Sequence, residues 1–148
     1  MPRIERSADV SWEGDVARGE GVLTAESGAF SELPFSLPTR IARVAGKTSP
    51  EELLAAAHAG CLTMSLATEL TEAGTPPTRL DVTCTIVMDE VEGQGHQIVG
   101  SVVTVTVRAS GLDEAGLAEA ARLADEGCPF SALLKRAGAT VEVSSRLA

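Results

Sequence analysis

Residues 49–74 read SPEELLAAAHAGCLTMSLATELTEAG, and this stretch determines how the rest of the chain has to be arranged. It opens with a strong helix signal. Ser49 is a favourable N-cap, Pro50 suits the first helical position, and Glu52 lies where a capping box requires an acid. We expect the helix to continue until just before Gly74, because glycine is the residue type that most often follows the end of a helix.

Apolar side chains, mainly Ala, Leu, Met and Cys, surround nearly the whole circumference of this predicted helix beyond Leu53. A helix that is apolar on all sides is buried on all sides. In a chain of 148 residues it should therefore be a central helix, covered by a sheet or by a second chain. A membrane span is disfavoured because polar residues interrupt the apolar run, namely His58, Thr63, Ser65, Thr68 and Glu69.

The segments before this helix are short and strand-like. Residues 8–12 and 19–24 alternate weakly between apolar and polar side chains, which favours two strands. Residues 35–40 are predicted as a third short extended segment, cut by Pro34 and Pro38. The N-terminal third of the chain is therefore expected to contribute strands and no helix.

The segments after the helix contain a hairpin. Residues 80–90 and 97–109 alternate β-branched and polar side chains, and a glycine-containing turn at 92–95 joins them. This pattern is typical of two antiparallel strands. Three further elements are expected: a helix at 113–126, a helix at 129–137 and a strand at 140–144.

The resulting element order is β-β-β-α-β-β-α-α-β. This order predicts an α+β fold in which a long central buried helix packs on a mostly antiparallel sheet. We found no linker, repeat or low-complexity segment, so we expect a single domain over residues 1–148.

Composition excludes several classes of function. The net charge is −9 and no cluster of Lys or Arg is present, which argues against a nucleic-acid partner. The N-terminus lacks the apolar run of a signal peptide, so we expect a cytoplasmic protein that does not bind membranes. The three cysteines are too few, and odd in number, for a structural disulfide framework.

Two of the cysteines have an ordinary structural interpretation. Cys84 lies in an alternating strand and is most simply a small buried residue. Cys61 lies midway along the apolar helix, where it is either a core residue or a reactive thiol. His58 is three residues earlier and on the same side of the helix. It either pairs with a Cys61 thiolate or is a hydrogen-bonded core histidine, and we favour the second interpretation.

Cys128 has a more distinctive position, between Gly127 and Pro129 just before a predicted helix. Free N–H groups and the helix dipole stabilise a thiolate there, although a small residue in a tight turn is the alternative. Zinc binding by His58, Cys61 and Cys128 is disfavoured because the chain has no closely spaced cysteine pair. A serine hydrolase is disfavoured because no Gly-x-Ser-x-Gly motif is present.

The two cysteine motifs together resemble those of one known family. SPEEL (49–53) and AAHAGC (56–61) are similar to the central-helix motif of the osmotically inducible protein C and organic hydroperoxide resistance (OsmC/Ohr) family. GCP (127–129), with Ser131 and Leu134 after it, resembles the second cysteine motif. The OsmC branch is the better match, and the resemblance extends in order over nearly the whole chain through WEGD (12–15), RGEG (18–21), TAESG (24–28) and TR (39–40).

The resemblance implies roles for particular residues. Cys61 matches the peroxidatic cysteine, Cys128 the resolving cysteine and Glu51 the family's carboxylate. Arg40 matches the arginine of the OsmC branch, and Arg18 in the N-terminal hairpin is the reserve candidate because the Ohr branch takes its arginine from there. The family forms intertwined homodimers with the active sites at the interface.

The implied activity is reduction of organic hydroperoxides, and less readily of hydrogen peroxide, in defence against oxidative or osmotic stress. A dithiol would reduce the enzyme, with a lipoylated protein as the family expectation, and no cofactor or metal is expected. The alternative is an OsmC-like protein that binds a small ligand without turnover, since resemblance of fold does not establish function.

Spacing along the helix supports a dimer independently. Glu51 and Cys61 are ten residues apart, which at a rise of about 1.5 Å per residue separates them by roughly 15 Å. If both are catalytic, as the resemblance implies, they cannot share a site on one straight helix, so either the helix is broken near its start or Glu51 acts on Cys61 of another chain. Two antiparallel helices from two chains would bring Glu51 of one chain near Cys61 of the other, and we therefore expect a two-fold symmetric dimer.

Overall fold

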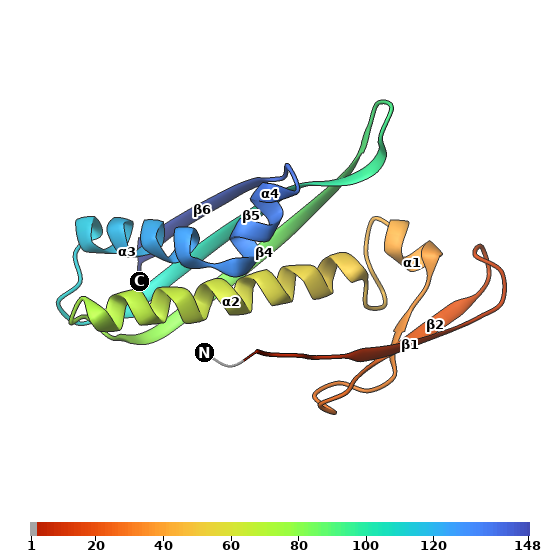
Figure 1. Ribbon diagram of the computed structural model, residues 1–148, viewed down its shortest axis with the longest axis horizontal. Coiled ribbons are helices and arrows are strands. Elements are labelled where there is room, and N and C mark those ends of the chain that lie inside the picture. The colour runs from red at the N-terminus through yellow and green to blue at the C-terminus, as the bar shows by residue number, and fades with distance from the viewer. Residues whose placement is uncertain (1–2) are drawn as a thin grey trace. The chain divides into compact units, whose positions relative to one another are not determined.

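The computed structural model describes residues 3–148. The chain forms two compact units, the first ending at Pro50 and the second beginning at Glu51, within the first turn of the long helix (Figure 1). Both units contain helix and sheet, so the predicted α+β class is confirmed. The expectation of a single domain over residues 1–148 stays a prediction.

The first unit is a three-stranded antiparallel sheet in the order β1-β2-β3 followed by a short helix. Its strands and helix are β1 (Ala8–Glu13), β2 (Glu20–Ala25), β3 (Leu33–Phe35) and α1 (Leu37–Ile41). The Phe35 ring packs against Trp12, with ring centroids 5.6 Å apart. It also lies over Gly21, where an added Cβ would come within 2.5 Å of the ring. A glycine is therefore required beneath this aromatic pair.

The prediction that residues 35–40 are extended is wrong beyond Phe35. Helix α1 begins there because Ser36 is an N-cap whose hydroxyl accepts a hydrogen bond from the Thr39 N–H, and Pro38 lies in the first turn, where proline is tolerated. A serine followed closely by a proline begins both α1 and α2, so Pro38 marks the start of a helix and not a break in a strand.

The second unit is built on a sheet in the order β4-β5-β6. Strands β4 and β5 pair antiparallel as predicted, with Cys84 opposite Val103, whereas β6 pairs with β5 in parallel. The sheet is therefore mostly antiparallel. Its helices and strands are α2 (Pro50–Glu72), β4 (Pro77–Val91), β5 (Gly95–Ala109), α3 (Glu114–Gly127), α4 (Pro129–Arg136) and β6 (Thr140–Leu147) (Figure 1).

The core of the second unit lies between α2, α3 and the inner face of β5. Helix α2 contributes a line of four buried side chains at every fourth position, one turn apart, and alternate residues of β5 meet them. Helix α3 closes the cluster, starting from an Asp113 N-cap. The cluster comprises Leu62, Leu66, Leu70, Val103, Val105, Val107, Leu117, Ala120, Ala121, Ala124 and Cys128.

Along α2 the buried positions form one line, and Met64 on another side is 67% exposed. Burial on all sides, as its composition predicted, is therefore not achieved within one chain. Among residues 3–148, α2 is the helix that is long and apolar enough to cross a membrane by length and composition alone. A core helix of a globular protein has the same properties, so this is weak evidence for a span.

Candidate functional site

The structure brings Cys61 and Cys128 together, although 67 residues separate them in the sequence. Cys61 lies midway along α2, and Cys128 is the residue between α3 and α4, which meet beside α2 (Figure 1). Cys128 is near enough to Cys61 to raise the pKa of its thiol, and the cysteines are free thiols. Cys128 is fully buried, whereas Cys61 is partly exposed.

The surroundings of Cys61 favour its neutral thiol. Burial is the main cause that raises the pKa of Cys61, and the hydrogen bond and charge of the neighbouring Cys128 raise that pKa further. The backbone N–H of Phe130, in the first turn of α4, acts in the opposite direction. Taken together, these contacts disfavour a thiolate at Cys61.

His58 lies one turn before Cys61 and is fully buried. Its Nδ1 forms a hydrogen bond of 2.8 Å with Ser101 Oγ on β5, and its Nε2 forms one of 2.8 Å with Ser131 Oγ on α4. Both serines are themselves fully buried. Because a serine hydroxyl occupies each ring nitrogen, the interpretation of His58 as a hydrogen-bonded core histidine is confirmed.

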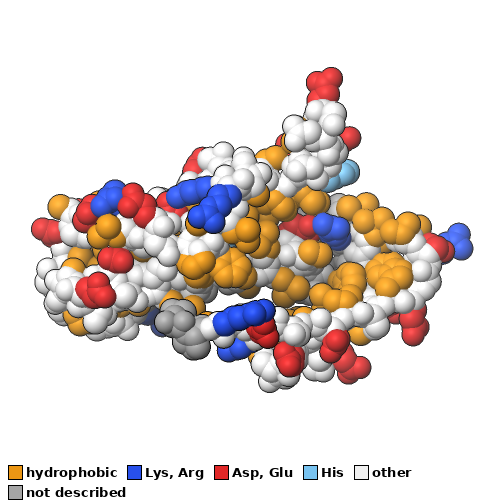
Figure 2. Space-filling view, viewed as in Figure 1, with side chains coloured by type: hydrophobic (Ala, Val, Ile, Leu, Met, Phe, Trp, Pro, Cys, Tyr) orange, Lys and Arg blue, Asp and Glu red, His pale blue; other side chains and the backbone are white. Residues whose placement is uncertain are grey.

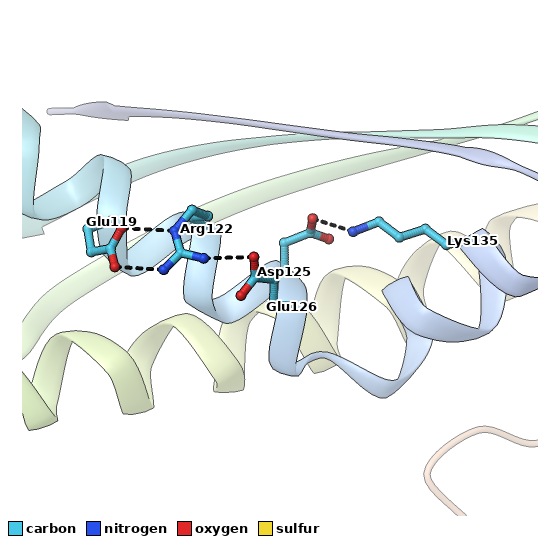
Figure 3. A network of polar contacts seen from close by, with 5 residues as sticks. All are labelled: Glu119, Arg122, Asp125, Glu126 and Lys135. Atoms are coloured by element: carbon cyan, nitrogen blue, oxygen red, sulfur yellow. Dashed lines mark hydrogen bonds and ion pairs between the residues drawn. The ribbon is translucent and has the colours of Figure 1, made fainter.

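The imidazole of His58 is held neutral. Burial lowers its pKa, because the charged form would lose its hydration in this core. Asp125 raises the pKa and Lys135 lowers it, and these two residues form an ion pair of 2.5 Å that joins α3 to α4 (Figure 3). On the exposed side of α3, Arg122 bonds to Glu119 and Glu126 (Figure 3).

Cys84 lies on β4 at the edge of the same polar cluster. Its sulfur is 3.3 Å from Ser101 Oγ and 3.8 Å from His58 Nδ1. It packs against the core of the second unit. It is therefore partly buried, where the sequence predicted a small buried residue.

Arg40 lies on α1 in the first unit and lines a hollow of about 220 Å³. The rest of the lining is mainly apolar, and Figure 2 shows hydrophobic side chains gathered where α1 and β2 lie. Arg18 lies between β1 and β2 in a polar hollow with Glu13, Asp15 and Glu20. The lining of the Arg40 hollow comprises Trp12, Val16, Phe35, Ser36, Leu37, Arg40 and Pro50.

Glu51 lies in the first turn of α2, in the second unit, ten residues before Cys61. Within the chain segment that the structure describes, no three His, Cys, Asp or Glu side chains are placed to hold a metal ion. The catalytic roles implied for Glu51, Arg40 and the two cysteines stay predictions.

Two serines of the cluster had no role in the sequence interpretation. Ser131 was noted as part of the second cysteine motif, and Ser101 is a serine in a strand dominated by valine. The alternation along the strand could have identified Ser101. It points to the same face as Val103 and Val105, so its hydroxyl should be buried and should have a hydrogen-bond partner.

The comparisons with known proteins agree with these motifs. The sequence model of the family described as OsmC-like protein matches residues 44–144. Peroxiredoxin OsmC of Escherichia coli (strain K12) is 37% identical over 132 residues, which are 89% of this chain and 91% of that protein. The chain belongs to the OsmC-like family. The family resemblance read from the cysteine motifs is therefore confirmed.

Solved structures of this family share the fold. An organic hydroperoxide resistance protein OsmC from Legionella pneumophila matches with a TM-score of 0.71 at 19% identity, covering 97% of this chain and 98% of the other. The organic hydroperoxide resistance protein OhrB of Bacillus subtilis matches with a TM-score of 0.67 at 24% identity, covering 96% and 98%. The predicted OsmC-like fold is thereby confirmed.

Proposed function

We propose that this OsmC-like protein is a thiol peroxidase that reduces organic hydroperoxides, and hydrogen peroxide less readily, in defence against oxidative or osmotic stress. The observation that carries the proposal is the pair of neighbouring free thiols, Cys61 and Cys128. Two comparisons support it: the 37% identical relative is named a peroxiredoxin, and family members of the same fold are named organic hydroperoxide resistance proteins.

In the first half-reaction Cys61 is the peroxidatic residue. Its thiolate attacks the distal oxygen of the hydroperoxide, the O–O bond breaks, and the alkoxide leaves with a proton as alcohol. Sulfur is oxidised by two electrons to a sulfenic acid while the peroxide is reduced. The partial exposure of Cys61 gives a substrate access to the sulfur.

In the second half-reaction Cys128 is the resolving residue. Its thiolate attacks the Cys61 sulfur, a disulfide forms, and the hydroxide leaves with a proton as water. The proximity of Cys128 to Cys61 supports this step, because a disulfide tolerates little variation in geometry. A dithiol, with a lipoylated protein as the family expectation, then reduces the disulfide by exchange.

Arg40 supplies the positive charge that the surroundings of Cys61 lack. A guanidinium stays charged and presents a planar set of donors to thiolate and peroxide oxygens. Glu51 orients Arg40 by a paired hydrogen bond. Arg40 is preferred over Arg18 because its hollow is apolar, which suits the organic part of a hydroperoxide, whereas the hollow of Arg18 is lined by acids.

The active protein is an intertwined homodimer in this proposal, with active sites at the interface. The apolar circumference of α2 supports it, because its own chain buries one line of α2 side chains and leaves Met64 exposed. Two antiparallel α2 helices would cover that surface and place Glu51 near Cys61 of the second copy. We infer further that residues 1–148 act as one OsmC-like domain, in the cytoplasm, without cofactor, metal, nucleic acid or membrane.

The deciding experiment is single-turnover oxidation of the reduced protein by cumene hydroperoxide, followed by free-thiol counting, intact mass and disulfide mapping. We expect rapid loss of two thiols per chain and a Cys61–Cys128 disulfide. Cys61→Ser should abolish the reaction, while Cys84→Ser should behave as the parent. Peroxide consumption by Cys61→Ser at the parental rate would refute the assignment.

The second candidate function is binding of a small ligand without turnover. The apolar hollow around Arg40 favours it, because its volume of about 220 Å³ accepts a small organic group. In that case cumene hydroperoxide would oxidise Cys61 no faster than it oxidises a free thiol in solution. An organic acid of similar size would nevertheless bind, as seen by calorimetry.

A further inference from the structure

The buried His58 has no part in the two chemical half-reactions, yet it lies beside the cysteines that do. It precedes Cys61 by three residues on α2, and its partner Ser131 follows Cys128 by three residues on α4. Three residues are about 4.5 Å along a helix axis, or one turn. The His58–Ser131 hydrogen bond therefore joins α2 and α4. On α2 it lies about one turn from Cys61, and on α4 it lies about one turn from Cys128.

The other ring nitrogen anchors the same histidine to the sheet. Nδ1 bonds to Ser101 of β5 at 2.8 Å, so the ring bridges α2, β5 and α4. Among residues 3–148, the polar contacts of the ring nitrogens go to the two serines and to Cys84, and none goes to Cys61 or Cys128. A fully buried, neutral and doubly bonded imidazole is suited to hold elements in place.

We propose that His58 is a positioning residue for disulfide formation, and that its bond to Ser131 holds Cys128 within reach of the Cys61 sulfenic acid. The inference rests on the proposed peroxidase function. The N-terminal end of α4 follows Cys128 directly, so a displacement of α4 displaces the Cys128 sulfur. The other tie between α3 and α4 is the ion pair Asp125–Lys135, which joins these two helices to each other.

A shift of about 1 Å between reacting groups slows a reaction by orders of magnitude. Loss of the His58–Ser131 bond should therefore slow the second half-reaction and leave the first unaffected. A sulfenic acid that is resolved slowly reacts with a second hydroperoxide to a sulfinic acid, releasing a second alcohol. Overoxidation of Cys61 is therefore the expected sign of a misplaced Cys128.

The test compares Ser131→Ala with Ser101→Ala. Each variant removes one fully buried hydroxyl that bonds to His58, but only Ser131→Ala removes the hydrogen bond between His58 and α4. Stopped-flow oxidation by cumene hydroperoxide gives the rate of sulfenic acid formation, and quenched intact mass gives the rate of disulfide closure. Ser131→Thr, which keeps the hydroxyl, is the rescue variant and serves as the folded comparison if Ser131→Ala does not fold.

We expect Ser131→Ala to form sulfenic acid at the parental rate, to close the disulfide about tenfold more slowly or worse, and to gain two oxygen atoms at Cys61 under excess hydroperoxide. Ser101→Ala and Ser131→Thr should close it at rates near the parent. Parental closure in Ser131→Ala, or equal slowing in Ser101→Ala, would overturn the positioning role. If the parent itself forms no disulfide, the proposed peroxidase function fails instead.

Discussion

The two proposed catalytic cysteines differ in exposure, and the difference matches the two roles. Cys61 is partly exposed and so open to a peroxide, whereas Cys128 is 0% exposed. A buried thiol is protected from reaction with solvent oxidants and meets only a sulfur that is already its neighbour. Reversal of the roles would require a peroxide to reach the fully buried sulfur.

Cys128→Ser should therefore separate the two half-reactions. With one equivalent of hydroperoxide, we expect Cys61 to be oxidised at the parental rate and to stop at the sulfenic acid, because no thiol resolves it and no second hydroperoxide oxidises it further. A sulfenic-acid trapping reagent followed by intact mass measures this product, and Cys84→Ser is the matched control that should still form the disulfide. Absence of any trapped adduct together with parental turnover would mean that Cys128 is not the resolving residue.

Arg40→Gln should slow the first half-reaction. Loss of charged hydrogen bonds of about 1.5–3 kcal/mol corresponds to a fall in rate of about tenfold to a hundredfold. Because burial and Cys128 raise the pKa of Cys61, the variant's rate should also increase as the pH rises toward that pKa and thiolate forms. The measurement is single-turnover oxidation by cumene hydroperoxide between neutral and alkaline pH.

Arg18→Gln is the matched control for Arg40→Gln, because it removes the same charge from the polar turn between β1 and β2. We expect it to react at a rate near the parent. If Arg18→Gln were the slow variant and Arg40→Gln were not, the peroxide would be bound from the N-terminal hairpin, as in the reserve assignment.

At the scale of elements, His58 ties α2 to β5 and to α4, and its pKa connects this packing to pH. Its ordinary pKa is about 6.5, and burial lowers it in the folded state, with Asp125 opposing and Lys135 assisting. Below pH about 6.5 the unfolded chain therefore binds more protons at this site than the folded chain does, so stability falls as the pH falls.

His58→Gln should remove that dependence. We expect the parent to lose free energy of unfolding as the pH falls below about 6.5, and the variant to lose less over the same interval. Carboxylates whose pKa is lowered in the folded state, such as Glu20, lose their contribution to stability at more acidic pH. They therefore do not obscure the effect of His58. Urea denaturation at several pH values measures the slope, and equal slopes in both proteins would show that His58 does not titrate on unfolding.

At the scale of the whole molecule, α2 leaves an apolar surface that its own chain does not bury. Met64 lies on that surface and is 67% exposed. A charged side chain inside an interface between two α2 helices would be buried without a partner, which is costly. We expect Met64→Arg to convert the proposed dimer to a monomer, as measured by sedimentation equilibrium.

Val102→Arg is the control for this substitution. Val102 is also an exposed apolar residue, but it lies on the face of β5 opposite to the core residues Val103 and Val105. It should leave the oligomeric state unchanged. A parent protein that is already monomeric would contradict the dimer directly, and would leave the apolar side of α2 without an explanation.

Local sequence determined most of the elements. Capping residues and periodicity act over a few neighbouring residues, so the start of α2 at Pro50, the β4–β5 hairpin and the start of α4 at Pro129 followed from them. Helix α1 differs from the predicted extended segment because Pro38, taken as a break in a strand, lies in the first turn of a helix that Ser36 caps. The family, too, was recognisable from two short motifs.

Only the tertiary structure decided which residues meet. The proximity of Cys61 to Cys128 depends on α4 folding back against α2, and no local signal spans the 67 residues between them. The same folding gave His58 its two serine partners, which lie 43 and 73 residues away. Sequence alone therefore determined most of the elements and the reactive residue types, because those depend on local interactions. Packing of apolar faces determined the pairing, because it joins residues that are distant in the chain.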